Sequence, residues 1–197
     1  IKIQLSIGRY IIDDKSLSIN DIMNNSLLAK RTIKGRYNVP VANYSREIQE
    51  SFMEEQRIIS QMDYALAEGQ FEMWLQPQYN HETGAMVGAE ALTRWHIPER
   101  DCMVRPDVFI PIFERNGFIY ELDKYIWEQV CVLLRRWIDE GAEALPVSVN
   151  VSRIDILQKD FFETFTGLVE KHRIPTALLQ LEITESAFSL ETVRIIE

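Results

Sequence analysis

The chain has 197 residues, of which 46% are hydrophobic and 26% are charged, and its formal net charge is −9. This composition is typical of a globular protein with a buried core, and no uninterrupted apolar stretch is long enough to span a bilayer. The acidic excess follows Ser45: residues 1–45 carry seven Lys/Arg against three Asp/Glu, and residues 46–197 carry fourteen against twenty-seven. We therefore expect no binding of a nucleic-acid polymer, which needs a basic surface, and no membrane contact. An acidic body is compatible with cations that in turn bind phosphates.

Cysteine and histidine are used in a way that argues against a disulfide framework and against zinc. Cys102 and Cys131 form no C-x-x-C motif, so we expect reduced thiols in a cytoplasmic protein. His81, His96 and His172 lie far apart without zinc-ligand spacing, and we expect them in loops or on the surface. The chain begins without Met and without a secretory signal, which suggests a segment excised from a longer protein.

Residues 1–45 read as a strand, a helix and a short extended tail. Alternating apolar residues from Ile3 to Ile7 predict the strand, and Ser18 or Asn20 can cap a helix that runs to about Lys30. Asn38-Val-Pro40 ends regular structure, and Val41–Tyr44 can pair as a short strand. Because one helix and two strands cannot enclose a core, this segment is expected to be the end of a larger domain.

Residues 46–68 predict a long charged helix, since the segment contains neither Gly nor Pro. One side of it carries a heptad-spaced series: Ile48, Phe52, Glu55, Ile59, Met62 and Leu66. Two interpretations remain open. The helix can be a linker packed on a neighbouring domain, or its apolar seam can join two copies of the chain.

From Gly69 the pattern changes to strands alternating with helices. Residues 71–79 and 86–95 predict a hairpin; residues 147–151 and 178–183 predict further strands; helices are expected from Pro106, over 121–140, over 160–171 and from Ser189. Strand–helix–strand order with right-handed crossovers predicts a parallel sheet, either doubly wound or a barrel. In a barrel the chemistry lies at the carboxyl ends of the strands.

Three segments each place an oxygen donor at the end of an apolar, strand-like run. They are Glu90-Ala-Leu-Thr-Arg94, Val149-Asn-Val-Ser152 and Leu181-Glu-Ile-Thr-Glu185. An unpaired carboxylate or amide in an apolar strand is costly, so three of them at successive strand ends indicate one shared polar site. Carboxylate and amide oxygens are ligands that Mg²⁺ and Mn²⁺ prefer.

Each segment also has a purely structural interpretation. Glu90 and Arg94 share one face of a strand and can form an ion pair inside the fold. Asn150 can act as a helix cap or turn former, Glu182 can be a structural carboxylate, and Glu185 can cap the following turn or hold a loop. The combination favours a metal site more strongly than any one segment does.

At these motifs the chain resembles a known family. From about Leu66 to Glu197 it is similar to the amino-terminal half of an EAL domain, the cyclic di-GMP phosphodiesterase family. The ordered matches are Leu75-Gln-Pro77, Glu90-Ala-Leu92 with Arg94-Trp95, Pro106, Phe109-Ile-Pro111, Glu114, Gly117-Phe-Ile119, Trp137, Val149-Asn-Val-Ser152 and Leu181-Glu-Ile-Thr-Glu-Ser186. Through Ser6-Ile-Gly8 and Ala29-Lys30 the opening segment resembles the end of a GGDEF domain, but the GGDEF signature is absent and no cyclase function is assigned.

The resemblance implies an α/β fold: about the first four strands of a (β/α)₈ TIM-like barrel of EAL type, with an antiparallel first strand. Residues 1–45 would be the GGDEF remnant, 46–68 a linker helix, and 69–197 the amino-terminal half of the EAL domain. The implied function is bacterial second-messenger signalling by Mg²⁺- or Mn²⁺-dependent hydrolysis of cyclic di-GMP to linear pGpG. The partners would be cyclic di-GMP and, through the linker helix or the barrel, a second copy of the chain.

By matching position the resemblance also implies roles for single residues. Glu90 and Glu182 would be catalytic and would ligate metal together with Asn150; Gln76, Leu92 and Arg94 would contact substrate, Arg94 at a phosphate; Glu185 would steady a loop. The family's paired aspartates, catalytic lysine and later glutamate have no counterpart in residues 1–197. We therefore expect these residues alone to be inactive. The alternative is a catalytically degenerate EAL receptor that binds cyclic di-GMP without cleaving it.

Overall fold

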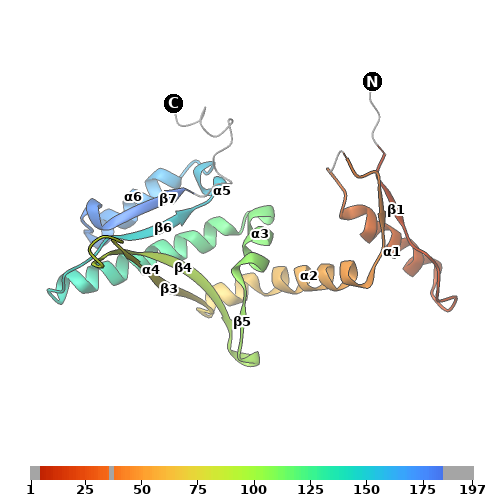
Figure 1. Cartoon of the computed structure of the whole chain (residues 1–197), viewed down its shortest axis with the longest axis horizontal. Helices are drawn as coiled ribbons and strands as arrows, with labels where there is room; N and C mark the ends of the chain where they lie inside the picture. Colours follow the sequence, from red (N-terminus) through yellow and green to blue (C-terminus); the bar gives the residue numbers. More distant parts are fainter. Residues whose placement is uncertain (1–4, 36–37, 184–197) are drawn as a thin grey trace, which may run out of the picture. The chain divides into compact units, whose positions relative to one another are not determined.

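The computed structural model describes residues 5–35 and 38–183, which form two compact units, residues 1–60 and 61–197 (Figure 1). In chain order the helices and strands are β1 Ile7–Arg9, α1 Ile19–Arg31, β2 Val41–Asn43, α2 Arg46–Ala67, β3 Phe71–Tyr79, β4 Met86–Ile97, β5 Cys102–Val104, α3 Pro106–Asn116, α4 Ile119–Asp139, β6 Val147–Val151, α5 Arg153–Ile156, α6 Phe161–His172 and β7 Leu179–Ile183. Short 3₁₀ turns cover Pro98–Arg100 and Thr176–Leu178. None of the helices within the described ranges combines the length and apolarity needed to cross a bilayer.

The first unit has the predicted order of a strand, a capped helix and a second strand, but the first strand covers Ile7–Arg9, whereas the predicted one ended at Ile7. Ser18 is the N-cap of α1: its side chain accepts from the backbone N–H of Asp21, and the Asp21 carboxylate accepts from the backbone of Ser18. The strands β1 and β2 pair in parallel, which confirms the expected strand at Val41. Gly8 is needed here because a Cβ at this position would lie 1.8 Å from the Ser26 carbonyl oxygen on α1.

The helix α2 has the predicted extent, and its heptad-spaced residues are all half-buried. The fully buried side chains of this helix are instead Ile58 and Ala65. The seam remains partly accessible to solvent in one copy of the chain. Whether it joins two copies therefore stays a prediction.

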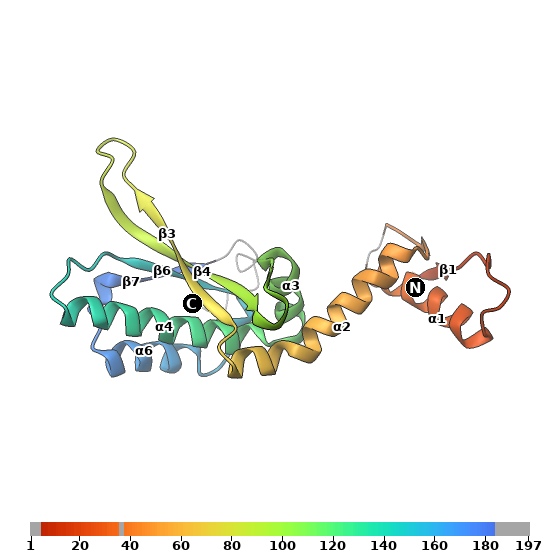
Figure 2. The same ribbon diagram turned by 90° about the horizontal axis from the view of Figure 1, so that it is seen from below.

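The second unit is a sheet in the order β3-β4-β6-β7, with β5 added beside the far end of β4. The strands β4, β6 and β7 run parallel, whereas β3 is antiparallel to β4. This confirms the predicted hairpin, the parallel sheet and the antiparallel first strand. The helix α4 packs against β6, and α6 packs against α4, so both lie on one face of the sheet (Figure 2).

An aromatic cluster joins the start of the hairpin to α3. Phe71, Trp95, Phe109 and Phe113 are each at most 2% exposed, with ring centroids 5.1–6.0 Å apart. The indole N–H of Trp95 donates to the Gln70 side-chain oxygen at 3.2 Å, which satisfies its one buried donor. This cluster packs α3 against the carboxyl end of β4.

One expectation for this unit was wrong in detail. The strand β4 runs to Ile97, so Glu90 lies inside the strand and not at its end; its parallel ladder with β6 covers only Ala89–Ala91. The strand β5, which has three residues, was not predicted. His96 lies on β4 near Glu72 and Asp101, with its side chain partly exposed. The two thiols are unpaired, as expected, and the helix expected from Ser189 lies outside the described residues.

Candidate functional site

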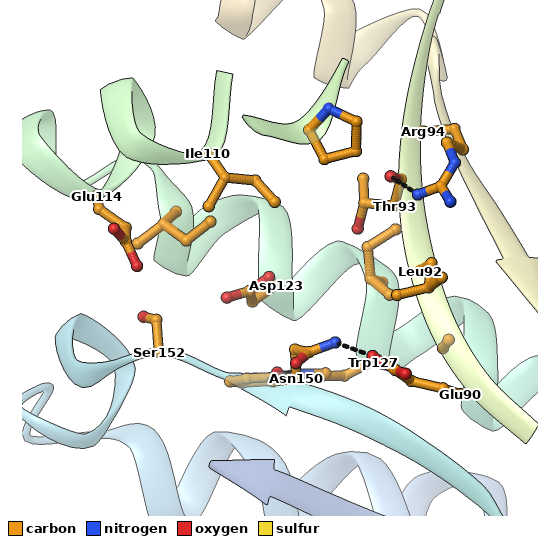
Figure 3. A pocket seen from close by; sticks show the side chains of 14 residues that line it. Glu90, Leu92, Thr93, Arg94, Ile110, Glu114, Asp123, Trp127, Asn150 and Ser152 are labelled. Atoms are coloured by element: carbon orange, nitrogen blue, oxygen red, sulfur yellow. Dashed lines mark hydrogen bonds between the residues drawn. The ribbon is translucent and has the colours of Figure 1, made fainter. Parts of the chain in front are cut away.

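Glu90 and Asn150 meet across two neighbouring parallel strands. The side-chain nitrogen of Asn150 donates to Glu90 Oε1 at 3.0 Å (Figure 3). Because β4 and β6 pair with Glu90 opposite Ser148, Asn150 lies one strand repeat further along the same face. The bond uses the amide nitrogen and one carboxylate oxygen. The amide oxygen and the second carboxylate oxygen remain able to bind a cation.

Glu182 lies on the next strand at the level of Asn150. The two residues are partners in the parallel ladder between β6 and β7, so their side chains leave the same face of the sheet. Glu182 is exposed. The three predicted ligands therefore share one face of three adjacent strands, and this face is opposite to the one that buries Val149 and Val151.

The predicted substrate contacts lie on the hairpin. Gln76 is opposite Glu90 in the antiparallel ladder, and Leu92 lines a cavity further along β4. Arg94 lies beyond Leu92, away from the Glu90–Asn150 pair (Figure 3). Its guanidinium donates to the Thr93 carbonyl at 3.0 Å and lies 6.0 Å from the Trp74 ring centroid. Glu185, the expected loop anchor, lies outside the described residues.

A cavity of about 260 Å³ opens beside the Glu90–Asn150 pair, between β4, β6 and the helices α3 and α4. Its walls combine apolar side chains with carboxyl groups. The lining residues on which the later argument depends are Glu90, Glu114, Asp123, Trp127, Asn150 and Ser152. The sequence analysis missed Asp123 and Trp127. The available signal was an aspartate inside the apolar stripe of α4, next to Leu122.

The segment that follows Asn150 is fixed to α4 and to its own capping box. Trp127 on α4 donates from Nε1 to the Asn150 carbonyl oxygen at 3.2 Å. Ser152 is the N-cap of α5: its hydroxyl accepts from the Asp155 backbone, and Asp155 Oδ2 accepts from the Ser152 backbone N–H at 2.6 Å. These bonds hold the carboxyl end of β6 in one conformation.

The carboxyl groups of Asp123 and Asp155, near the segment that follows Asn150, are both buried. Burial raises the pKa of Asp123 well above its ordinary value, and the neighbouring carboxyl groups of Asp155 and Glu114 raise it further. Burial also raises the pKa of Asp155, although hydrogen bonds from Ser152 and Asp123 lower it in part. Among the described residues, no three His, Cys, Asp or Glu side chains converge closely enough to hold a metal ion.

Comparison with known proteins identifies the family. The EAL domain model matches residues 59–196. The chain belongs to the EAL domain family. The match extends over the second unit, which confirms the resemblance carried by the motifs from Leu75 to Ser186. The mixed α/β fold of this unit is of the TIM-barrel type, to which EAL domains belong.

Two relatives come from Pseudomonas aeruginosa, and both are named for cyclic di-GMP turnover. The bifunctional diguanylate cyclase/cyclic di-GMP phosphodiesterase MucR is 24% identical over 186 residues, which cover 94% of this chain and 27% of MucR. The cyclic di-GMP phosphodiesterase NbdA is 28% identical over 184 residues, covering 92% of this chain and 23% of NbdA. The chain thus spans about a quarter of the length of these relatives.

A solved phosphodiesterase structure supports the assignment of the fold. The structure described as the PaMucR phosphodiesterase in complex with c-di-GMP is 25% identical, with a TM-score of 0.65. The match covers 71% of this chain and 56% of the other.

Proposed function

We propose that this chain is part of a bacterial phosphodiesterase that hydrolyses cyclic di-GMP to linear pGpG with Mg²⁺ or Mn²⁺. The observation that carries the proposal is the hydrogen bond between Glu90 and Asn150, with Glu182 in register on the next strand. It supports a site at which oxygen donors from three strands share one face. The relatives named for this activity support the choice of substrate.

The donor set fits a hard divalent cation, because it consists of two carboxylates and an amide oxygen. Glu90, Asn150 and Glu182 would hold the ion, which when bound supplies an activated water and stabilises charge at phosphorus. Glu90 and Glu182 are thereby the proposed catalytic residues. The Glu90–Asn150 bond keeps both side chains in place before the ion arrives, which lowers the ordering that binding requires.

The β3–β4 hairpin, and the loop that Glu185 would steady, would orient the substrate. We propose that Arg94 grips a phosphate of cyclic di-GMP through its planar guanidinium, and that Gln76 and Leu92 contact the ligand beside it. The backbone bond to Thr93 limits the conformations of the Arg94 side chain. Glu185 would steady a loop near the site; this assignment rests on the sequence motif alone.

We also propose how the chain is divided into domains. We propose that residues 1–45 are the end of a GGDEF domain, 46–68 a linker helix, and 69–197 the amino-terminal half of the EAL domain, in a cytoplasmic protein. Alignment of MucR with 94% of this chain supports a GGDEF-like origin of the first segment. Residues 1–197 contain three of the expected donors and no counterpart of the family's catalytic lysine, so we propose that they do not hydrolyse cyclic di-GMP by themselves.

The test compares turnover in the full-length protein with and without the proposed ligands. We expect hydrolysis of cyclic di-GMP that stops with a chelator and returns with Mg²⁺ or Mn²⁺, and a loss of at least a hundredfold in Glu90→Ala. Glu82→Ala is the matched control, because Glu82 is an exposed carboxylate in the turn of the same hairpin. Retained metal-dependent turnover in Glu90→Ala would refute the assignment. Binding of cyclic di-GMP without turnover in the unmodified protein would instead establish the degenerate receptor.

A further inference from the structure

Asp155 contains a buried oxygen atom to which no donor within the described residues donates. The residue is 0% exposed, and its Oδ2 is satisfied by the Ser152 backbone N–H, but no donor within residues 5–35 and 38–183 reaches its Oδ1. A buried carboxylate oxygen without a partner is unfavourable. A group that supplies a hydrogen to this oxygen would remove that cost.

Asp123 is the group in position to do so. It is 8% exposed, and its carboxyl group interacts directly with that of Asp155. The titratable groups that act on Asp123 are Asp155 on α5 and Glu114 on α3, and both are acidic. A proton shared by two buried carboxyl groups removes the repulsion between their charges and gives one of them a hydrogen to donate.

We propose that Asp123 is protonated in the folded protein and donates a hydrogen bond to Asp155 Oδ1, and that this bond positions Asn150 for its role in the site. Burial raises the pKa of both groups; the contact between them raises the pKa of Asp123 further and offsets part of the rise at Asp155, as expected for this donor and acceptor.

The Asp123–Asp155 bond is connected to Asn150 through two short series of contacts. Asp155 is bonded to Ser152, two residues after Asn150. Trp127, one helical turn after Asp123 on α4, donates to the Asn150 carbonyl oxygen. The carboxyl pair and the indole thus attach the end of β6 to α4 on both sides of Val151. Asp123 does not touch the proposed metal ligands through any hydrogen bond described here, so it is a positioning residue.

The sign of the pH effect follows from the raised pKa of Asp123. Between the ordinary aspartate pKa and the raised one, the folded protein holds a proton that the unfolded chain has released. The stabilisation is fully present below the ordinary pKa and is lost as the pH rises through the raised pKa. An amide at this position would donate to Asp155 at every pH. Asp123→Asn should therefore flatten the dependence of Tm on pH, whereas Asp123→Leu removes the donor.

The first experiment measures the proton itself, in the intact protein without ligand. Carboxyl ¹³C NMR of labelled aspartate over a pH series should show one aspartate that titrates well above the ordinary aspartate pKa; this signal should be absent in Asp123→Asn and present in the exposed control Asp63→Asn. Tm should fall by roughly 3–10 °C in Asp123→Leu, the loss expected for one unsatisfied buried group, and should fall by less in Asp123→Asn. Titration of Asp123 at the ordinary aspartate pKa, or equal losses in both variants, would overturn the proposal.

The second experiment tests the positioning role, which rests on the proposed function. The side-chain amide resonances of Asn150 should keep their positions in Asp123→Asn and shift in Asp123→Leu. In the full-length protein, cyclic di-GMP hydrolysis should survive the first substitution and drop at least tenfold in the second. If the shared proton is found but neither the Asn150 resonances nor turnover respond, the positioning role fails and the proposed function stands. If the unmodified protein has no turnover while the Asn150 resonances respond, the proposed function fails and the positioning role stands.

Discussion

Replacing Asn150 with aspartate would put two carboxylates where the structure has a hydrogen bond. The present bond joins Asn150 Nδ2 to Glu90 Oε1 at 3.0 Å. The substitution keeps the size and shape of the side chain but turns a donor into an acceptor. It therefore tests whether the two side chains meet in solution, and it does so without removing any packing.

The expected loss of stability has two parts. A hydrogen bond to a charged acceptor contributes about 1.5–3 kcal/mol. Two unit charges about 3 Å apart repel each other by roughly 1.4 kcal/mol in water and by roughly 5.5 kcal/mol at an effective dielectric constant of 20. Uptake of a proton by one carboxyl group of ordinary pKa near 4 limits the repulsion to about 4 kcal/mol at pH 7. Because both side chains are half-buried, both parts apply, and we expect a total loss of about 3–7 kcal/mol.

The assay is urea unfolding of the wild type, Asn150→Asp and the control Asn150→Ala over a pH series. Asn150→Ala loses the bond without adding charge, so it should lose only about 1.5–3 kcal/mol. The introduced carboxyl group has a raised pKa in the folded state. The extra loss in Asn150→Asp should therefore appear as the pH rises through that pKa, and nearly vanish near pH 4. Added Mg²⁺ should restore more stability to Asn150→Asp than to the wild type. Equal stability of the two variants at pH 7 would show that Glu90 and residue 150 are not in contact.

Two further predictions concern the thiols and α2. Burial raises the pKa of Cys131 to about 11, so at pH 8 a thiol reagent should modify Cys102 in the folded protein and Cys131 only after denaturation; rapid modification of both would contradict the buried position. If the heptad seam of α2 joins two copies, light scattering should show a halved mass for Ile59→Asp and Met62→Asp but not for Met53→Asp, whose side chain is exposed off the seam. An unchanged mass in all three variants excludes α2 from the interface.

The parts of the fold that the sequence predicted depend on local signals. The start of α1 follows from Ser18 and Asp21, which are three residues apart and form a complete capping box. The hairpin follows from two alternating runs around the turn at residues 81–84. The elements that were missed depend on distant contacts: β5 exists because Trp95–Ile97 offers it a partner, and three residues alone carry no pattern. Residues 91–95, which place Glu90 inside β4, are held in the strand by their ladder with β3.

The candidate site was predictable as a set of donors, but its supporting groups were not. A carboxylate in an apolar strand is visible in the sequence, since it breaks the pattern of its own segment. Asp123 also breaks a pattern, but its meaning depends on Asp155, 32 positions later, and on the unsatisfied oxygen that only the fold reveals. Trp127 looks like an ordinary core residue of α4 until its N–H is found on the Asn150 carbonyl.

The register of the parallel ladders decides whether the donors can act together. Side chains alternate between the two faces of a strand, so a slip of β6 by one residue would turn Asn150 toward the helices and away from Glu90 and Glu182. Val149 and Val151 oppose that slip because their burial beneath the helices would be exchanged for exposure. At about 1.5–3 kcal/mol for each buried valine, they hold the register more strongly than the polar contacts do. The apolar residues between the donors are therefore as necessary to the proposed metal site as the donors themselves.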